Sequence, residues 1–350
     1  MNVRTENLFL AGTGAYIPPR ASVAEAVRRG AYDRERMDSC GWRNIAVSDG
    51  VSAPDMAVAA VRQAVRRSGL GPEDIDLLVH SCAYHQGPDG WSAPHYILRS
   101  TLGSTVPALT VEQGCNAFLA ALEMAAQYLL CASSRNGAVV SAADNFGAPS
   151  VDRWYAHRDA VLADAATAVV LSKQSGWAAL RSVESVSLPH FEILNRGHEP
   201  IFPPAVTTGR ALDMNEHLEA MVEELGPKAS EIVQEYGASG TKLVEQVTAE
   251  AGIAVADVSR VLHLGAATAD FLDSHLRPMG LDAALGAVDF FRDVGHAGAT
   301  DVGLQLNHHV EAGDLSAGDH LLLLSAGPGL MITAAVVTVL ETPGSEGRDA

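Results

Sequence analysis

The apolar positions of residues 116–130 recur at helical spacing and predict about four turns of alanine-rich helix. The stripe consists of Phe118, Leu119, Leu122, Ala125, Ala126, Leu129 and Leu130. A Gly114-Cys115 pair comes immediately before it, which places Cys115 at or near the first helical turn. Free backbone N–H groups and the positive end of the helix dipole would stabilise a thiolate there. The simpler alternative is a small buried residue that packs against the start of the helix.

Short apolar runs without alternation predict strands that are buried on both faces, as in a parallel sheet. These runs are residues 76–82, 137–141 and 166–171, and a glycine-interrupted strand is predicted over residues 8–17. Residues 52–70 have apolar positions at helical spacing, with Ser52 or Asp55 as the N-cap. Strands that alternate with helices in this way indicate an α/β fold.

The second half of the chain repeats patterns of the first half at a nearly constant offset. His80 in DLLVHSC is echoed by His263 in SRVLHLG, 183 residues later (263 − 80). Ser141 in GAVVSAAD is echoed by Ser325 in LLLLSAGPG, 184 residues later (325 − 141). Two echoes in register indicate a duplicated βα unit.

The duplication predicts two halves that share one cleft. Residues 1–180 carry Cys115, and residues 181–350 carry His296 at a comparable place, 181 residues further on (296 − 115). Residues 190–252 depart from the strand pattern and contain two polar, acid-rich stretches at helical spacing, about 214–224 and 241–250. This segment is expected to be a helical cover over the cleft, or else a surface excursion.

Composition narrows the class of protein. The 350 residues are 47% hydrophobic and 19% charged, and no apolar run is long enough to span a bilayer. The N-terminal residues show no signal-peptide pattern, and the four cysteines follow no metal-ligand spacing, so we expect reduced thiols in a cytoplasm. A formal net charge of −18 argues against nucleic acid or an anionic membrane as a partner.

A glycine-rich loop, VGHAGATD, contains the residues that would serve a cysteine nucleophile. His296 lies in this loop, and Asp301 follows where a helical pattern begins. A nucleophilic cysteine needs a base, and the base needs a group that fixes its tautomer and orientation. Cys115, His296 and Asp301 supply one group of each type. Alternatively, His296 is a turn residue and Asp301 a helix N-cap, although Asp301 could also do both.

Two further elements are candidates for binding a carbonyl group. His263 ends a predicted strand, where ligands of α/β sheets gather, and it is either a donor to a thioester carbonyl or a core histidine like His80. The closing turn SAGPG is expected to bring the backbone N–H of Gly327 or Gly329 towards Cys115. Together with the N–H of Cys115, this would form an oxyanion hole.

The motifs of several other chemistries are missing from the sequence. There is no G-x-[SC]-x-G elbow, no phosphate-binding G-x-x-x-x-G-K-[ST] and no strand-linked G-x-G-x-x-G. There is also no H-E-x-x-H and no paired C-x-x-C, so the sequence implies no metal and no permanently bound cofactor.

The segments QGCNAF, LADAATAVVL, VLHLGAA, VGHAGATD and LLLLSAGPG, in this order, resemble the ketoacyl-acyl-carrier-protein synthase III family of the thiolase fold. The resemblance covers nearly the whole chain. It implies a five-layered αβαβα fold of two duplicated halves, a homodimer, and transfer of an acyl group from coenzyme A or an acyl carrier protein to Cys115. His263 matches the family's histidine, but Leu264, Gly265 and Ala266 depart from the usual P-H-Q-A-N.

The second departure changes the expected reaction. His296 occupies the position of the family's asparagine, and a titratable imidazole beside a carboxylate is a proton acceptor. This resembles the acyltransferase branch from antibiotic and polyketide pathways, which includes the cervimycin-type malonyltransferase and forms no carbon–carbon bond. Pro328, in the glycine-rich turn, is a further departure because it has no N–H to donate.

The sequence therefore predicts an acyltransferase that moves a short acyl group, malonyl among the candidates, through a Cys115 thioester to a small-molecule acceptor. The acceptor group would be a hydroxyl of a sugar or polyketide-type product, and no carbon dioxide would be lost. The alternatives are a decarboxylating condensing or starter-unit priming enzyme that uses Cys115 and His263, and a catalytically silent partner subunit.

Overall fold

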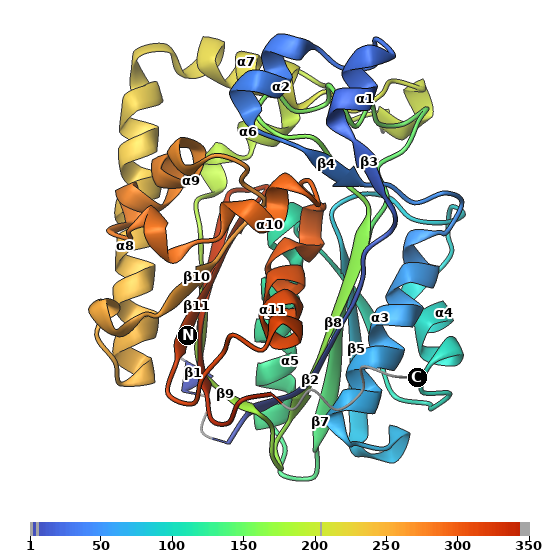
Figure 1. The fold of residues 1–350 in the computed structure, drawn as a ribbon, viewed down its shortest axis with the longest axis vertical. Helices are drawn as coiled ribbons and strands as arrows, with labels where there is room; N and C mark the ends of the chain where they lie inside the picture. The colour runs from blue at the N-terminus through green and yellow to red at the C-terminus, as the bar shows by residue number, and fades with distance from the viewer. Residues whose placement is uncertain (1–2, 5–6, 204, 344–350) are drawn as a thin grey trace.

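The computed structural model describes residues 3–4, 7–203 and 205–343, which form five layers (Figure 1). From left to right in the figure, these are helix α8 (Ala229–Ala251), a first group of strands, helices α5 (Ala117–Leu130) and α11 (Asp301–Ala312), a second group of strands, and helices α3 (Ala53–Ser68) and α4 (Ala93–Ser100). The predicted αβαβα layering is confirmed.

The strands of the N-terminal half run in the order β6-β5-β7-β8-β2. Their bounds are β2 Phe9–Tyr16, β5 Ile75–Cys82, β6 Ala108–Glu112, β7 Gly137–Asp144 and β8 Ala165–Ser172. β5 is parallel to β6 and β7, whereas β8 is antiparallel to β7 and β2. Every residue of β7 and β8 is buried, as their uninterrupted apolar runs predict.

The strands of the C-terminal half repeat this arrangement in the order β10-β11-β12-β9. Their bounds are β9 Ala178–Ser187, β10 Arg260–Leu262, β11 His320–Gly327 and β12 Met331–Val339, and the short β1 (Val3–Arg4) pairs with β9. β10 is parallel to β11, and the pairs β11–β12 and β12–β9 are antiparallel, as in β5-β7-β8-β2. The predicted duplication is therefore visible in strand order and direction. Two residue pairs between β2 and β9 join both groups of strands into one ten-stranded sheet.

Glycines let the outer helix α3 approach the sheet closely. A Cβ atom at Gly12 or Gly14 of β2 would lie 2.2 Å from a backbone oxygen of α3, at Ala64 and Ala60 respectively. The helix backbone therefore lies directly on the strand, which explains the glycines that interrupt it. The Ser52 side chain caps the helix by accepting a hydrogen bond from the N–H of Asp55, and α3 ends before Gly69.

Helix α5 is buried between the two groups of strands because its small side chains fit there. Its residues pack in one core with Leu77 and Val140 on one side and Leu323 and Val337 on the other. An alanine-rich helix suits this central layer, since close-packed interiors leave little room between two sheets. The predicted helix after Cys115 is thus confirmed.

The segment predicted as a cover divides into two parts. Helices α6 (Ile193–Arg196) and α7 (Met214–Leu225) are drawn at the top of the view in Figure 1, the end at which α1 (Val23–Arg28) and α2 (Arg34–Cys40) also lie. Helix α8 begins 12 residues before the predicted residue 241 (241 − 229) and packs its apolar face on β9 and β12. It forms an outer layer, the counterpart of α3. Leu243, Val244 and Val247 in its C-terminal turns are buried in the core against the strands. Among the described residues, no helix is long and apolar enough to cross a membrane.

Candidate active site

Cys115 lies in a tight turn, Gly114–Asn116, that leads directly into α5. The side chain is half-buried and lines a cavity of about 500 Å³. Gly114 has a φ of +53°, and a Cβ atom there would lie 2.2 Å from Cδ of Pro328. Only glycine combines this backbone conformation with the close approach of the proline ring.

The turn between β11 and β12 is held against the cysteine turn. The Ser325 hydroxyl donates a hydrogen bond to the carbonyl oxygen of Cys115 at 3.0 Å. The side-chain amide of Gln113 donates to the carbonyl oxygen of Pro328. The two loops, one from each half of the chain, are thus fixed to one another.

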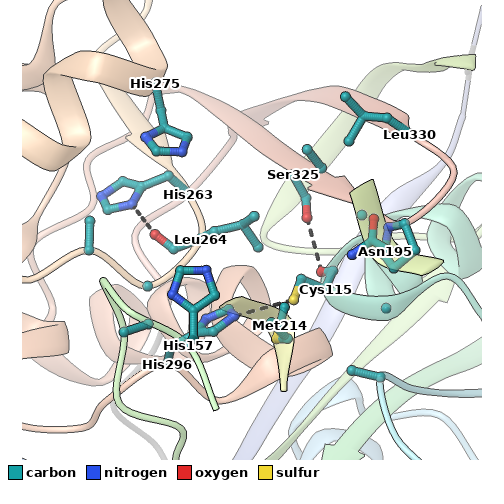
Figure 2. A pocket seen from close by; sticks show the side chains of 18 of the residues that line it. Cys115, His157, Asn195, Met214, His263, Leu264, His275, His296, Ser325 and Leu330 are labelled. Carbon is teal, nitrogen blue, oxygen red and sulfur yellow. Dashed lines mark hydrogen bonds between the residues drawn. The ribbon is translucent and has the colours of Figure 1, made fainter. Parts of the chain in front are cut away.

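His296 faces Cys115 across the cavity floor (Figure 2). Its Nε2 lies 3.2 Å from Sγ of Cys115, which is within hydrogen-bond reach. The backbone of His296 is fixed on both sides, since its N–H donates to the Val161 carbonyl and its carbonyl accepts from the Ala163 N–H, at 2.9 and 2.8 Å. These contacts hold the imidazole on a rigid support.

Asp301, the first residue of α11, is fully buried and orients His296. Its Oδ2 lies 2.5 Å from Nδ1 of His296 and accepts the backbone N–H of Gly265 at 2.6 Å. Its Oδ1 accepts the N–H of Ala297 at 2.8 Å. The carboxylate therefore favours the tautomer that carries a proton on Nδ1 and turns Nε2 towards the thiol.

The surroundings of His296 favour its charged form. Burial alone would lower its pKa, but the Asp301 carboxylate and the Cys115 thiolate, with their hydrogen bonds, raise the pKa of His296 well above its ordinary value. His296 is therefore suited to accept the proton of the Cys115 thiol, and a thiolate is the form in which a cysteine acts as a nucleophile.

The departure at Gly265 and the departure at His296 belong together. A Cβ atom at Gly265 would lie 2.9 Å from Cα of His296 and 3.0 Å from Oδ2 of Asp301. Any side chain at this position would therefore push the histidine loop away from its carboxylate. In this chain, the contact between His296 and Asp301 therefore requires glycine at position 265.

His263 lines the same cavity, but its hydrogen bonding differs from that of a carbonyl donor. Its Nδ1–H donates to the carbonyl oxygen of Leu264 at 2.6 Å, and its buried Nε2 has no hydrogen-bond partner among the described residues. Burial lowers the pKa of His263 to about 4, so the ring is neutral at pH 7. With the single proton on Nδ1, Nε2 is an acceptor and cannot donate to a thioester carbonyl.

We expect His263→Leu to flatten the acid limb of the stability curve. An unfolded histidine has a pKa of about 6.5, so between pH 6.5 and 4 the unfolded state binds more protons and wild-type stability falls as pH falls. The slope for one such group approaches about 1.4 kcal/mol per pH unit. Urea unfolding from pH 4.5 to 7.5 measures it, and parallel curves for the two proteins would contradict a buried neutral His263.

The sequence analysis missed two residues at the site. His157 lines the cavity, and its Nδ1 accepts the N–H of Asp159 at 3.1 Å, which leaves the proton on Nε2. Burial, with a smaller contribution from nearby His296, lowers the pKa of His157 to about 4. No motif surrounds His157 in the sequence, and only the fold brings its loop to the cavity.

Asp144, the second missed residue, holds the loop that carries His296 in place by hydrogen bonds. Its carboxylate accepts the N–H groups of Ala83, Tyr84 and Ala299 at 2.8, 3.1 and 2.9 Å. Burial raises the pKa of Asp144 to about 7, although these hydrogen bonds partly offset the effect. Its position at the carboxyl end of the buried strand β7 was the available signal, since ligands and polar groups gather at such ends.

The predicted oxyanion donors are only partly placed at the cavity. Gly327 and Pro328 line it together with Cys115, whereas Gly329 is not among its described lining residues. The roles of the Cys115, Gly327 and Gly329 N–H groups stay predictions. Among the described residues, no group of three or more His, Cys, Asp and Glu side chains is arranged to hold a metal ion.

Comparison with known proteins identifies the family of the chain. Residues 109–186 match the family of 3-oxoacyl-[acyl-carrier-protein (ACP)] synthase III, and residues 248–339 match the C terminal part of that family. The beta-ketoacyl-[acyl-carrier-protein] synthase III of Rhodospirillum centenum is 27% identical over 336 residues, which are 93% of this chain and 97% of that protein.

Solved structures extend the likeness to the whole fold. The structure of ChlB3, described as an acyltransferase, is 37% identical with a TM-score of 0.89, over 97% of this chain and 99% of that chain. The 3-oxoacyl-[acyl-carrier-protein] synthase III of Aquifex aeolicus has a TM-score of 0.75 at 19% identity, over 95% and 99%, which shows the fold alone. This chain is therefore a transferase-type enzyme that belongs to the 3-oxoacyl-[acyl-carrier-protein] synthase III family, with its thiolase-like fold.

Proposed function

We propose that this enzyme transfers an acyl group from a coenzyme A or carrier-protein thioester to a hydroxyl acceptor, through a Cys115 thioester and without decarboxylation. The observation that carries the proposal is the contact chain from Sγ of Cys115 to Nε2 of His296, and from Nδ1 of His296 to Asp301, at 3.2 and 2.5 Å. A base held by a carboxylate serves proton transfer.

In the first step, the Cys115 thiolate attacks the thioester carbonyl of the donor. The bond between the carbonyl carbon and the sulfur of coenzyme A breaks, and the His296 imidazolium gives its proton to the departing thiolate. In the second step, His296 takes the proton of the acceptor hydroxyl while its oxygen attacks the acyl-enzyme. The Cys115 thiolate then leaves, and the Asp301 carboxylate stabilises the imidazolium in both steps.

The same contacts argue against the condensing reaction. Decarboxylative condensation needs hydrogen-bond donors aimed at the enolate oxygen. Nε2 of His263, the residue that matches the family's histidine, is an acceptor and does not provide such a donor. The proposed transfer uses coenzyme A as part of the substrate and needs no resident cofactor. The malonyl group, the natural-product acceptor and the homodimer stay parts of this proposal.

Carboxyl-labelled malonyl-CoA distinguishes the two reactions. We expect the acyl-enzyme, incubated with malonyl-CoA or malonyl carrier protein, to release no labelled carbon dioxide above the level of Cys115→Ala. An ester should form when hydroxyl acceptors are added, because His296 then removes the hydroxyl proton. Scintillation counting and mass spectrometry measure the two products. Carbon dioxide released in step with a new ketoacyl product would establish the condensing reaction instead.

A further inference from the structure

His157 offers the cavity a hydrogen-bond donor that the proposed mechanism does not use. Its Nδ1 accepts the N–H of Asp159 at 3.1 Å, so the proton of the neutral ring lies on Nε2. Among the described residues, no group accepts a hydrogen bond from this N–H. Nε2 of His263 is fully buried without a partner, whereas Nε2 of His157 is not fully buried and the residue lines the cavity. The N–H of His157 is therefore open to a bound molecule.

His157 is a donor and not a second base. Burial, and after it the charge of nearby His296, lowers the pKa of His157 to about 4, so the ring is neutral at pH 7. Because Nε2 carries the proton and Nδ1 holds the N–H of Asp159, the ring has no free site that takes up a proton in place of His296.

The loop that carries His157 is held in place. The guanidinium of Arg36 donates through Nη2 to the carbonyl oxygens of His157 and Arg158, at 2.7 and 2.8 Å. It also lies over the rings of Tyr32 and Tyr155, at 5.6 and 5.1 Å from their centroids. Further along, the same loop is hydrogen-bonded on both sides to the backbone of the proposed base. The donor and the base are thus fixed relative to one another, as the positioning of a reactant requires.

The donor lies on the side of the base. Figure 2 shows the ring of His157 beside the ring of His296 and away from Ser325. The effect of the His296 charge on the pKa of His157 agrees with this closeness, although burial is the larger cause. The turn after Ser325 holds Gly327, the expected donor to the thioester carbonyl, so that role does not need His157. A molecule that gives its proton to Nε2 of His296 lies next to the N–H of His157.

From this placement we infer that His157 binds the acceptor of the acyl group, by donating its Nε2–H to the attacking oxygen, and so selects a hydroxyl over an amine. The inference rests on the proposed function and specifies how its acceptor is recognised.

A hydroxyl fits this pair of rings because it has one proton and two lone pairs. The proton goes to Nε2 of His296, one lone pair accepts from His157, and the other attacks the acyl carbon. The carbon–oxygen bond forms and the bond to the Cys115 sulfur breaks, while His157 keeps its proton. A neutral amine has a single lone pair, which the attack needs, so its second N–H would face the N–H of His157. Two opposed donors without an acceptor are destabilising.

Two variants of His157 isolate the N–H group. His157→Leu removes it, and His157→Gln keeps an amide N–H at about the reach of Nε2. Both variants lose the acceptor of the Asp159 N–H, so any loosening of the loop is common to them. Wild-type protein and both variants are loaded with acetyl-CoA or malonyl-CoA, and the acyl-enzyme then reacts with 2,2,2-trifluoroethanol.

We expect loss of the N–H to slow only the second step. Transfer to trifluoroethanol should be about 10-fold slower in His157→Leu and within about twofold of wild type in His157→Gln, since a neutral hydrogen bond contributes about this much. Hydrolysis of the acyl-enzyme, in which water replaces the alcohol, should follow the same order. Acylation of Cys115 should change by less than about twofold in both variants. Intact-mass spectrometry in single turnovers measures all of these rates.

An isosteric amine tests the selection. 2,2,2-Trifluoroethylamine has the shape of the alcohol, and its fluorines keep it neutral at pH 7.5. The ratio of the alcohol rate to the amine rate should fall at least about 10-fold from wild type to His157→Leu, because the variant no longer holds the alcohol oxygen or opposes the amine N–H.

The outcomes separate this inference from the proposed function. Equal transfer rates in His157→Leu and wild type, or equal losses in His157→Leu and His157→Gln, would overturn the role of the N–H and leave acyl transfer standing. An acylation rate that falls as much as the transfer rate would also overturn it, because the N–H would then serve the thioester carbonyl. An unchanged ratio of alcohol to amine rates would overturn the selection. If no thioester acylates Cys115 in the wild type, the proposed function itself fails.

Discussion

Cys115→Ala should abolish formation of the acyl-enzyme. Wild-type protein incubated with a thioester donor is expected to gain one acyl mass, and the variant none, because the thiolate beside His296 is the group that attacks. Turnover should fall to the level without enzyme. Intact-mass spectrometry, followed by peptide mapping of the labelled cysteine, measures both effects.

The other three cysteines are internal controls for this result. Burial raises the pKa of Cys82 to about 12, so it stays a thiol. Cys131 is exposed, and its Sγ accepts a hydrogen bond from the guanidinium of Arg135 at 2.8 Å. Cys40 is the last residue of α2. An acyl group mapped to Cys40, Cys82 or Cys131 in wild-type protein would contradict the assignment of Cys115.

The sequence was sufficient for those parts of the site that have local signals. The helix after Cys115 is periodic, and its start is marked by Gly114, which the close approach of Pro328 requires. His296 and Asp301 are five residues apart in one glycine-rich loop, so their contact is nearly local. Their contact with Cys115 spans 181 residues, and only the register of the two halves made it predictable.

Other parts depend on tertiary contacts that leave no local pattern. His157 and Asp144 carry no motif. Their roles arise because the loop between β7 and β8 brings His157 to the cavity, and because the end of β7 brings Asp144 to the N–H of Ala299 in the loop that carries His296. Helix α8 was predicted only over residues 241–250 and as a polar, acid-rich helix, whereas Leu243, Val244 and Val247 in that stretch pack on the sheet. The tautomer of His263 is set by its hydrogen bond to the carbonyl oxygen of Leu264, the next residue. The sequence does not specify the direction in which that carbonyl points, so the tautomer could not be predicted.

The closing prediction concerns the pair of His296 and Asp301, which should act as one unit. His296→Ala removes the base, for which losses of about 10²–10⁴ in rate are typical. In Asp301→Asn the amide nitrogen replaces either Oδ2, which accepts from Nδ1 of His296 and the N–H of Gly265, or Oδ1, which accepts from the N–H of Ala297. The first placement favours the wrong tautomer of His296, and the second sets two donors against each other beside the histidine loop. We expect each substitution to lower turnover by about 10²–10⁴ and the double variant to be no slower than the worse single variant.

Two controls make this result specific to the pair. His308 lies on the same helix as Asp301 but stacks on Phe290, so His308→Ala should leave turnover within about twofold of wild type, as surface changes away from the site usually do. His263→Leu should cost less than His296→Ala, since Nε2 of His263 donates no proton. Single-turnover kinetics with the acyl-enzyme and a hydroxyl acceptor measure the wild type and all five variants. If the rate losses of the two single variants multiply in the double variant, Asp301 acts independently of His296. If His263→Leu loses more turnover than His296→Ala, His263 is the base.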